Sequence, residues 1–523
     1  MALTKATYRM SNSAPVSALD FGADNTGSAD SSSAIQSAVN SLSGGGTVVL
    51  PTGTYLLSSG VVLGDNVNIA GTAGGSIINC ASMSGGAFGA ITAGANSIVQ
   101  DLKFTGIAED VAGAAAIKVS GKDGAIIQDC IITGFGEGIL LDDCDDVLVK
   151  NNKITGVGRW GIRYAKATNI VISNNVIKNS VTYDGIKGDS TIYGDATLYS
   201  SSNVLIDSNI SSGNNRDGID VSSQGDSITV SNNICDSNTL MGMEIKKLHS
   251  YSSDIELVNV FGNTCTNNGS HGIRFDDVLS SKASGNIIEG NGDVGIRITY
   301  CKDCDVLDNI IKNNSTDGIR LQGLSGNTCE YINVLGNKCI NNGNGSGSAI
   351  QIEDYCDYVV VKQNSCYQNT ASKTDNGIFV SGTTATTRFI TIKDNYAPNS
   401  LTNAGQGIVI TGTHSGDNIV IGNNDMSTTG VVSFTDGDTT PNIYGCNKLY
   451  QTANTGSTTI TTFDGGSYEM EAFTILFNDA NTTVNSSSSL RLKGAANKTF
   501  TQYSTLTLVC RNNVFYEIAR QET

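Results

Sequence analysis

The stretch that decides the fold is NISSGNNRDGIDVSSQGDSITVSNNICDSNTLMGMEI, residues 209–245. It contains Asn209 and Asn233 and the steps Gly218-Ile219 and Gly242-Met243, and each feature returns after 24 residues. Short runs such as Ile228-Thr229-Val230 alternate apolar and polar side chains, which is typical of β-strands. A β pattern that returns at a regular interval predicts a repeat architecture of stacked coils.

The same two features continue along most of the chain, with Gly-Ile steps or close variants at intervals of 22 to 33 residues. The steps begin at Ala116, Gly138, Gly161, Gly185, Gly218, Gly242, Gly272, Gly295, Gly318, Ala349, Gly377 and Gly407. The Asn positions are Asn152, Asn175, Asn209, Asn233, Asn263, Asn286, Asn309, Asn337, Asn364, Asn395 and Asn423, and we expect their side chains to stack at one turn. Three short strands per coil predict an all-β fold, a right-handed parallel β-helix.

The two ends differ from the repeat. Asp30 is placed to cap a helix over about residues 31–42, with Ile35, Val39 and Leu42 on one face, and this helix is expected to cover the first coil. After about residue 445 both ladders stop, although strands are still expected at 473–477 and 505–509. We therefore predict an N-terminal extension at 1–20, a β-helix at 21–445 and a small β domain at 446–523.

Composition excludes several classes of protein. The chain has 523 residues with 60 Gly and 4 Pro, and its net charge of -17 would repel a phosphate backbone, so no nucleic-acid partner is expected. The first residues lack a signal-peptide pattern and no apolar run is long enough for a membrane span, so we expect no membrane partner and synthesis in a cytosol. The 13 cysteines are expected to be free thiols.

A column of charged residues follows the Gly-Ile steps. If each Ile points inward, the next residue points outward, because side chains alternate along a strand. The outward column is Leu140, Arg163, Lys187, Asp220, Glu244, Arg274, Arg297, Arg320 and Gln351. Stacked arginines repel each other unless carboxylates offset their charge, and Asp276 and Asp317 are placed to do so.

The two ends of the chain carry a family resemblance. APVSALDFGADNTGSADSSSAIQSAVNSLSGGGTVVLPTGTYLL (residues 14–57), the preceding LTKATYRM (residues 3–10) and the final LTLVCRNNVFYEIAR (residues 506–520) resemble the borders of bacteriophage tailspikes with a pectate-lyase-like β-helix. The resemblance implies a homotrimer in the virion tail, made in the host cytoplasm and trimerised through the C-terminal domain. It also implies a protein that binds and often cleaves bacterial surface polysaccharide, such as capsule or lipopolysaccharide O-antigen.

The short N-terminal extension is a departure from that family. Fewer than about 20 residues precede the expected β-helix, so we expect the particle-binding head domain to be absent or supplied by another virion tail protein. The family has no shared catalytic motif to place on this sequence, so the site is predicted from the coils.

Hydrolysis of a glycosidic bond needs two carboxyl groups, one acting as acid and one as base or nucleophile. Asp220 and Glu244 occupy adjacent coils of the outward column, and Asp217 and Asp184 lie just before their Gly-Ile steps. We predict Glu244 as the acid and Asp220 or Asp217 as the base, with Asp184 in reserve, because close carboxylates raise one pKa. No metal ion and no other cofactor is expected there.

Substrate binding is predicted along the same stripe. The predicted residues are Arg163, Lys187, Arg274, Arg297, Arg320, Trp160, Tyr183 and His271. Trp160 is expected in an outward turn where it stacks on a sugar ring, with packing beneath a loop as the alternative. Insertions at 187–203, 244–257 and 320–332, which carry Tyr193, Tyr199, Tyr251 and Tyr331, are expected to form the wall of a groove.

Three functions are consistent with these residues. The first is an endo-acting glycosidase on a surface polysaccharide. The second is a polysaccharide lyase, in which the cationic column holds uronates and the turn with Asp142, Asp143, Asp145 and Asp146 binds Ca²⁺. The third is a non-enzymatic adhesin or structural tail fibre that only binds the polymer.

Overall fold

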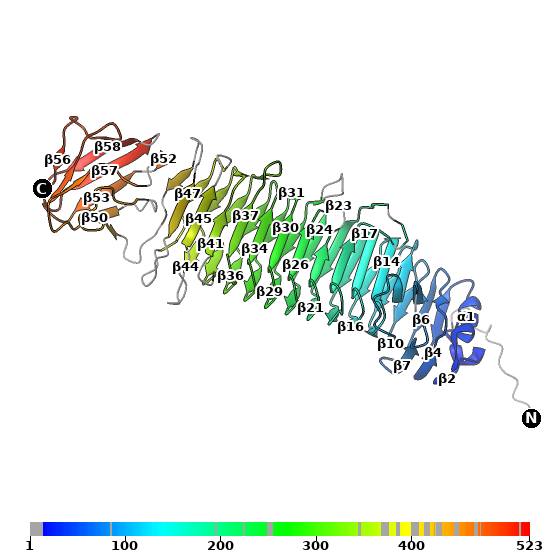
Figure 1. The fold of residues 1–523 in the computed structure, drawn as a ribbon. Coiled ribbons are helices and arrows are strands. Elements are labelled where there is room, and N and C mark those ends of the chain that lie inside the picture. Colours follow the sequence, from blue (N-terminus) through cyan, green and yellow to red (C-terminus); the bar gives the residue numbers. More distant parts are fainter. Residues whose placement is uncertain are drawn as a thin grey trace, which may run out of the picture. The chain divides into compact units, whose positions relative to one another are not determined.

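Parallel β-coils make up most of the protein, as the ribbon of the computed structural model shows (Figure 1). Two compact units, Met1–Ser281 and Lys282–Thr523, divide the chain. The structure describes residues 14–83, 86–192, 194–195, 197–222, 225–247, 255–343, 347–367, 376–382, 387–398, 407–412, 419–422, 424, 431–443, 449–464, 469–470, 472–511 and 514–523.

In the first unit, three series of short parallel strands repeat from coil to coil. The first series is β11 (Ala114–Ser120), β14 (Glu137–Asp145), β17 (Ile162–Ser173), β19 (Ile186–Asp189), β22 (Ile219–Val221), β26 (Met243–Lys246) and β30 (Ile273–Asp276). The second is β12 (Ile126–Gln128), β15 (Leu148–Lys150), the later part of β17, β20 (Ser202–Asp207), β24 (Ile228–Ser231) and β28 (Asn259–Phe261). The third is β10 (Lys103–Thr105), β13 (Ile131–Thr133), β16 (Lys153–Thr155), β18 (Val176–Lys178), β21 (Ile210–Ser212), β25 (Ile234–Asp236) and β29 (Thr264–Thr266).

The predicted inward and outward columns are confirmed in this unit. Ile162, Ile186 and Ile219 are fully buried in the coil interior. Their outward neighbours stack in register from strand to strand. The strand pairing places Arg163 opposite Lys187, Lys187 opposite Asp220, Asp220 opposite Glu244, and Glu244 opposite Arg274. The column therefore follows from the alternation of side chains along each strand.

The predicted asparagine ladder is present, and it satisfies backbone groups as expected. Asn175 Oδ1 accepts from both the backbone N and the Nδ2 of Asn152, at 2.9 and 3.0 Å, and Asn152 Nδ2 also donates to Ile127 O. The pattern runs to Asn263 in the first unit and from Asn286 in the second. Its last described rung is Asn424, which accepts from Asn395, whereas the predicted Asn423 lies outside the described residues.

A second asparagine ladder accompanies the first and was not predicted. Asn214, Asn238 and Asn268 repeat the same pair of bonds in the first unit, and Asn291, Asn314 and Asn342 do so in the second. Glycine is required between the ladders, since a Cβ at Gly218 would lie 2.7 Å from the carbonyl oxygen of Gly242. Both features hold successive coils at a close and constant spacing.

The one α-helix among the described residues, α1 (Ser32–Asn40), lies at the N-terminal end of the coils (Figure 1). It begins one residue later than predicted, and Asp30 Oδ1 accepts from the backbone N of Ser32 at 3.1 Å. Gln36 of α1 exchanges two hydrogen bonds with the backbone of Val62 in β5 (Val61–Val62), at 2.8 and 2.9 Å. The helix thus satisfies strand-edge groups that would otherwise be exposed, as predicted.

The second unit continues the three-strand coil. Its first series is β34 (Ile296–Thr299), β37 (Ile319–Gln322), β41 (Ser348–Ile352), β45 (Asn376–Gly382) and β47 (Ile408–Gly412). The second is β32 (Lys282–Ser284), β35 (Asp305–Leu307), β39 (Asn333–Leu335), β43 (Val360–Lys362), β46 (Thr391–Lys393) and β48 (Val420–Gly422), and the third is β33 (Ile287–Glu289), β36 (Ile310–Lys312), β40 (Lys338–Ile340) and β44 (Ser365–Tyr367). Arg297, Arg320 and Gln351 stack in register, as predicted.

The last part of the chain forms small mixed sheets. The larger sheet has the order β49 (Val432–Ser433), β50 (Leu449–Thr452), β53 (Phe473–Phe477), β57 (Thr505–Arg511), β58 (Val514–Gln521) and β55 (Leu490–Arg491). The smaller contains β51 (Thr458–Ile460), β54 (Thr482–Val484) and β56 (Lys498–Thr499). Both predicted strands are present, while the domain boundaries at residues 20 and 445 stay predictions. Within the described residues, no helix has the length and hydropathy of a membrane span.

Candidate functional site

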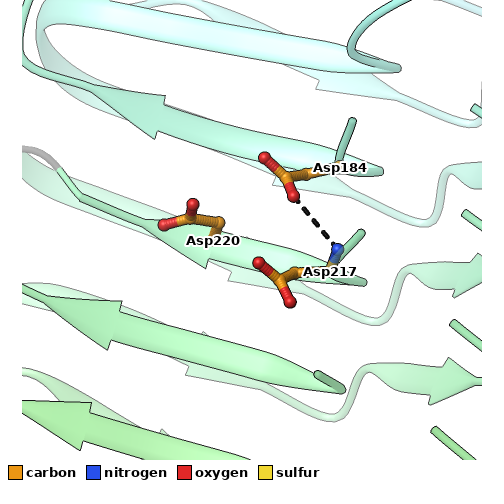
Figure 2. Close-up of side chains that lie close together, drawn as sticks. All are labelled: Asp184, Asp217 and Asp220. Carbon is orange, nitrogen blue, oxygen red and sulfur yellow. Dashed lines mark hydrogen bonds between the residues drawn. The ribbon is translucent and has the colours of Figure 1, made fainter. Parts of the chain in front are cut away.

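Three buried aspartates gather on two neighbouring coils of the first unit, and we call Asp184, Asp217 and Asp220 the acid cluster. Asp184 precedes β19, Asp217 precedes β22, and Asp220 lies within β22. Each offers a carboxylate oxygen, and these three oxygens lie within 4.8 Å of one another. Figure 2 shows the three side chains side by side, with the bond from Asp217 N to Asp184 that joins the two coils.

Asp184 is held by hydrogen bonds on both oxygens. Its Oδ1 accepts from the backbone N of Asp217 at 3.0 Å, and its Oδ2 accepts from the indole Nε1 of Trp160 at 3.3 Å. Asp217 is held on one side only: its Oδ1 accepts from Met241 N at 2.8 Å, while its buried Oδ2 has no hydrogen-bond partner. A buried polar oxygen without a partner calls for an explanation, and a catalytic role is one of those that apply in native structures.

Asp220 is surrounded by cations. Its Oδ2 accepts from Lys187 Nζ at 2.6 Å and lies 3.6 Å from Lys246 Nζ, and its Oδ1 accepts from Ser222. The next coil continues this pairing, because Glu244 forms ion pairs with Lys246 and, at 3.2 Å, with Arg274. Cations of the column and of the neighbouring Lys246 therefore contact both carboxylates, which offsets the repulsion that stacked like charges would cause.

The acid cluster holds its carboxyl groups in different ionisation states. Burial, together with the charges of Asp220, Asp184 and Glu244, raises the pKa of Asp217 to about 8. Burial and the charge of Asp220 also raise the pKa of Asp184. Burial alone would raise the pKa of Asp220, but Lys187 and Lys246 hold it below its usual value. At neutral pH the cluster thus combines a protonated Asp217 with an ionised Asp220.

Arg216 is the most exposed charged group beside the cluster. Its guanidinium lies 3.9 Å from Asp184 Oδ1 and 3.8 Å from Asp217 Oδ2, and 35% of the side chain is exposed. Asp184, Asp217 and Asp220 themselves are fully buried. The carboxyl groups are therefore covered in this structure, and Arg216 is the partly exposed side chain that lies against two of them.

Trp160 does not have the exposed position expected for stacking on a sugar ring. It is 8% exposed, because Arg159 lies over its ring at 4.4 Å and the ring of Tyr183 lies 5.1 Å away. The alternative expectation, a packing role, describes its surroundings better. Tyr183 remains partly exposed beside it.

Arg163 is also covered rather than exposed. It pairs with Asp142 and Asp189, at 3.2 Å each, and donates to the backbone of Thr191 in the loop that follows β19. A residue on the outward face of a strand is therefore not always exposed in this protein, because the insertion at 187–203 covers part of the column. Tyr199 of that insertion lies under Lys166 Nζ at 4.6 Å, whereas Tyr193 and Tyr251 lie outside the described residues.

Three of the predicted binding residues have partners of their own outside the acid cluster. His271 is buried two coils beyond Asp217 in the same column of turns, since Gly218 N bonds Met241 O and Gly242 N bonds His271 O. Arg297 and Arg320 belong to the second unit, where Arg297 donates to Gln322 and Arg320 to Asp317, each at 2.6 Å. The expected neutralisation of Arg274 by Asp276 and of Arg320 by Asp317 is confirmed.

Metal binding is best considered at the acid cluster. Among the described residues, Asp184, Asp217 and Asp220 are the only group of three or more His, Cys, Asp or Glu side chains close enough to hold an ion. Lys187 and Lys246 already neutralise Asp220, and they would compete with a cation. In the turn proposed for Ca²⁺, Asp142 pairs with Arg163 and Asp143 with Lys166 at 3.0 Å.

Two site residues were missed by the sequence prediction. Lys246 follows Glu244 by two positions, so alternation along the strand places both on the outward face. Arg216 immediately precedes Asp217 at the turn. Both were visible as charged neighbours of predicted residues, but the sequence alone did not indicate which carboxylates they contact.

The comparisons with known proteins agree with this architecture. The family model described as "Right handed beta helix region" matches residues 30–193, 115–273 and 198–348, so the chain belongs to that family. A search of curated proteins finds no match.

Solved structures share the fold at low sequence identity. The A-module of mannuronan C-5 epimerase AlgE4 from Azotobacter vinelandii is 19% identical, with a TM-score of 0.50 over 79% of this chain and 100% of that one. The catalytic unit of a GH87 α-1,3-glucanase from Streptomyces thermodiastaticus is 19% identical, with a TM-score of 0.52 over 68% and 69%. The Dettilon tailspike protein is 17% identical, with a TM-score of 0.49 over 72% and 70%. At this identity the likeness concerns the fold.

Proposed function

We propose that the protein is an endo-acting polysaccharide depolymerase that hydrolyses glycosidic bonds of a bacterial surface polysaccharide at the acid cluster. The observation that carries this proposal is the pair Asp217 and Asp220. Their surroundings drive their pKa values in opposite directions, one to about 8 and the other below its usual value. A protonated and an ionised carboxyl side by side are the two groups that glycoside hydrolysis requires.

Asp217 is the proton donor in this proposal, in place of Glu244. Its Oδ2 makes no hydrogen bond within the chain, so the proton it carries is available to the oxygen of the leaving sugar. Glu244 is already engaged in ion pairs with Lys246 and Arg274, and its role is to hold these two cations in place.

Asp220 is the base or the ionised stabiliser. Lys187 donates one hydrogen bond to Asp220 Oδ2, and Ser222 donates one to Oδ1. Because a carboxylate has about four lone-pair sites, Asp220 can still accept a hydrogen bond from a water molecule. Asp184 positions Asp217 through the backbone bond, and Trp160 positions Asp184. Arg216 and Tyr183 are the partly exposed groups that first meet the substrate.

The structural neighbours support the substrate class only as an analogy. A β-helix carries glycan chemistry in the α-1,3-glucanase and the mannuronan epimerase named above. Fold alone does not assign an activity, so the proposal depends on the carboxyl pair. Assembly as a homotrimer and attachment to a virion tail rest on the resemblance at the two ends of the sequence, and light scattering of the purified chain tests the trimer.

The experiment is incubation of the purified chain with capsule and lipopolysaccharide from candidate host bacteria. We expect the polymer to shorten and new reducing ends to form, without the ultraviolet absorbance of a new double bond. Asp217→Asn and Asp220→Asn should each abolish shortening, whereas Asp317→Asn, a buried aspartate of the second unit, should not. Ultraviolet-absorbing products would select the lyase, and binding without shortening would select the adhesin.

A further inference from the structure

An aromatic column occupies one turn of the second unit. Tyr331, Tyr358 and Phe389 follow Asp303 in successive coils, since Asp303 N bonds Glu330 O, Tyr331 N bonds Asp357 O, and Tyr358 N bonds Arg388 O. All four residues have positive φ, between 52° and 58°. Asn and Asp tolerate this conformation best, whereas bulky side chains are unusual there. Consecutive aromatic residues at such a turn therefore require an explanation beyond the turn itself.

The same turn in the first unit shows what the backbone prefers. Its positive-φ residues include Asp146, Asn169, Asn203, Ser227, Leu257 and Ser280, and all of these except Leu257 are small and polar. In the second unit, Tyr331 and Tyr358 stack with their ring centroids 4.7 Å apart, and Tyr358 and Phe389 do so at 4.5 Å. Yet Tyr331 is 50% exposed and Tyr358 is 41% exposed. Because much of each ring remains in water, burial within the chain explains only part of their presence.

A groove runs beside this column. The residues two positions further on, Asp305, Asn333 and Val360, pair in register and form a parallel outward column. The two columns flank an open depression of about 360 Å³ lined by Asp303, Asp305, Tyr331, Asn333, Tyr358 and Val360. This volume falls within the range of about 300–1,000 Å³ that is usual for small-molecule sites.

The chemistry of the groove matches an uncharged sugar. A sugar ring has an apolar C–H face and a rim of hydroxyl donors, and the groove offers aromatic surface flanked by the carboxylates of Asp303 and Asp305. Asn333 donates to Asp305 at 2.9 Å, which leaves the amide oxygen as a further acceptor. None of the lining residues is a cation, so uronate or phosphate groups would be repelled.

We propose that the groove between Tyr331, Tyr358 and the column Asp305–Asn333 is a second glycan-binding site, specific for neutral sugar units. Successive coils repeat the same columns at about 4.8 Å, so the site is extended along the direction of stacking. It lacks cations such as Lys187, Lys246 and Arg274 of the first unit, and it does not depend on the acid cluster being catalytic.

Site-resolved nitration of tyrosines tests this proposal on the full chain. The probes are laminarihexaose and a β-1,4-linked galactohexaose as neutral sugars, with hexagalacturonate as the anionic control. Tyr503 is the internal reference, because it is 61% exposed and also has a positive φ, 68°. We expect at least one neutral hexamer to slow nitration of Tyr331 and Tyr358 at least threefold, while Tyr503 is unaffected and hexagalacturonate protects neither.

The proposal is overturned if no neutral hexamer protects these tyrosines, or if Tyr503 or hexagalacturonate gives the same protection. Protection that grows with protein concentration in the absence of sugar, together with a larger mass in light scattering, would instead make this face an interface between copies of the chain. The double variant Tyr331→Asn/Tyr358→Asn places favoured residues at both turns. We expect it to melt no lower than the wild type and to lose retardation on a neutral-glycan gel.

Discussion

Asp217 in the first unit and Asp317 in the second occupy the same kind of turn, each followed by Gly-Ile, yet their carboxyl groups have different surroundings. Both are fully buried, and burial raises the pKa of both. Both accept a backbone bond from the next coil, from Met241 N and Ser348 N. Asp317 is then neutralised by Arg320 three positions on, whereas the corresponding residue after Asp217 is Asp220.

The same backbone turn thus holds one aspartate beside a cation and the other beside a second carboxyl group. Arg320 donates to the second oxygen of Asp317 and satisfies it. Asp220 instead adds a negative charge beside Asp217, whose second oxygen stays without a hydrogen-bond partner. The residue in the outward column therefore decides whether the second oxygen of the turn aspartate is paired with a cation or lies beside another carboxyl group.

The largest expected effect is on activity. Asp217→Asn removes the proposed acid and should lower kcat about 10²–10⁴-fold, measured as reducing ends released from the polysaccharide. Asp317→Asn is the matched control and should leave kcat unchanged. Equal losses in the two variants would mean that the turn, and not the chemistry of Asp217, matters.

The same substitution should have the opposite effect on stability. A carboxyl whose native pKa is raised contributes stability that is complete below its unfolded pKa of about 4 and is lost as the pH rises through about 8. The loss is at most about 1.4 kcal/mol per pH unit, and Asp217→Asn does not suffer it. Thermal unfolding above pH 8 should therefore find the variant more stable than the wild type, and a less stable variant would contradict the raised pKa.

Substitution of Asp220 and of Arg320, the residues three positions after the two turn aspartates, tests the same comparison through stability. Asp220→Asn leaves Lys187 without its carboxylate and Lys246 with Glu244 alone, which should cost about 3 kcal/mol in the free energy of unfolding. Arg320→Gln should cost only about 1 kcal/mol, because Asp317 can take up a proton. Denaturant titration of both variants measures the two costs, and a larger cost for Arg320→Gln would reverse this interpretation.

The pH profile of hydrolysis should be bell-shaped. Activity should fall about tenfold per pH unit above pH 8, as Asp217 loses its proton, and should fall again only below pH 4, where Asp220 becomes protonated. Initial rates across this range measure both limbs. An alkaline limb that stays flat well beyond pH 8 would remove Asp217 as the acid.

The smallest effect is expected at Trp160. Trp160→Phe keeps the ring between Arg159 and Tyr183 but removes the 3.3 Å bond to Asp184. A hydrogen bond to a carboxylate contributes about 1.5 kcal/mol, so kcat should fall about tenfold or less, with KM nearly constant. A large rise in KM alone would indicate that Trp160 contacts the sugar directly.

Much of the fold could be predicted because it follows from local periodicity. The Gly-Ile steps set the register of the outward column, and the regular Asn positions indicated the ladder. The second ladder had an equally regular signal, since Asn214, Asn238 and Asn268 each follow a first-ladder residue by five positions. The second ladder was therefore predictable from the sequence.

The ionisation states of the site residues could not be predicted from the sequence. Alternation along a strand predicts which face a side chain occupies, but it does not predict which other side chains cover that face. Trp160 was therefore expected to be exposed, whereas it is buried. Four candidate carboxylates were identified, but which of them keeps a proton depends on its distances to Lys187, Lys246 and Arg274 in neighbouring coils. Those distances depend on the side-chain packing of several coils together.

The most direct test of the central claim is an infrared pH titration of the wild type, with the spectrum of Asp217→Asn subtracted at each pH. The claim predicts a protonated-carboxyl band at neutral pH that disappears with a midpoint near pH 8 and is missing from the variant. Asp317→Asn should leave that band in place. A difference spectrum without a protonated-carboxyl band at neutral pH would contradict the account, because Asp217 would then be ionised and unable to act as the acid.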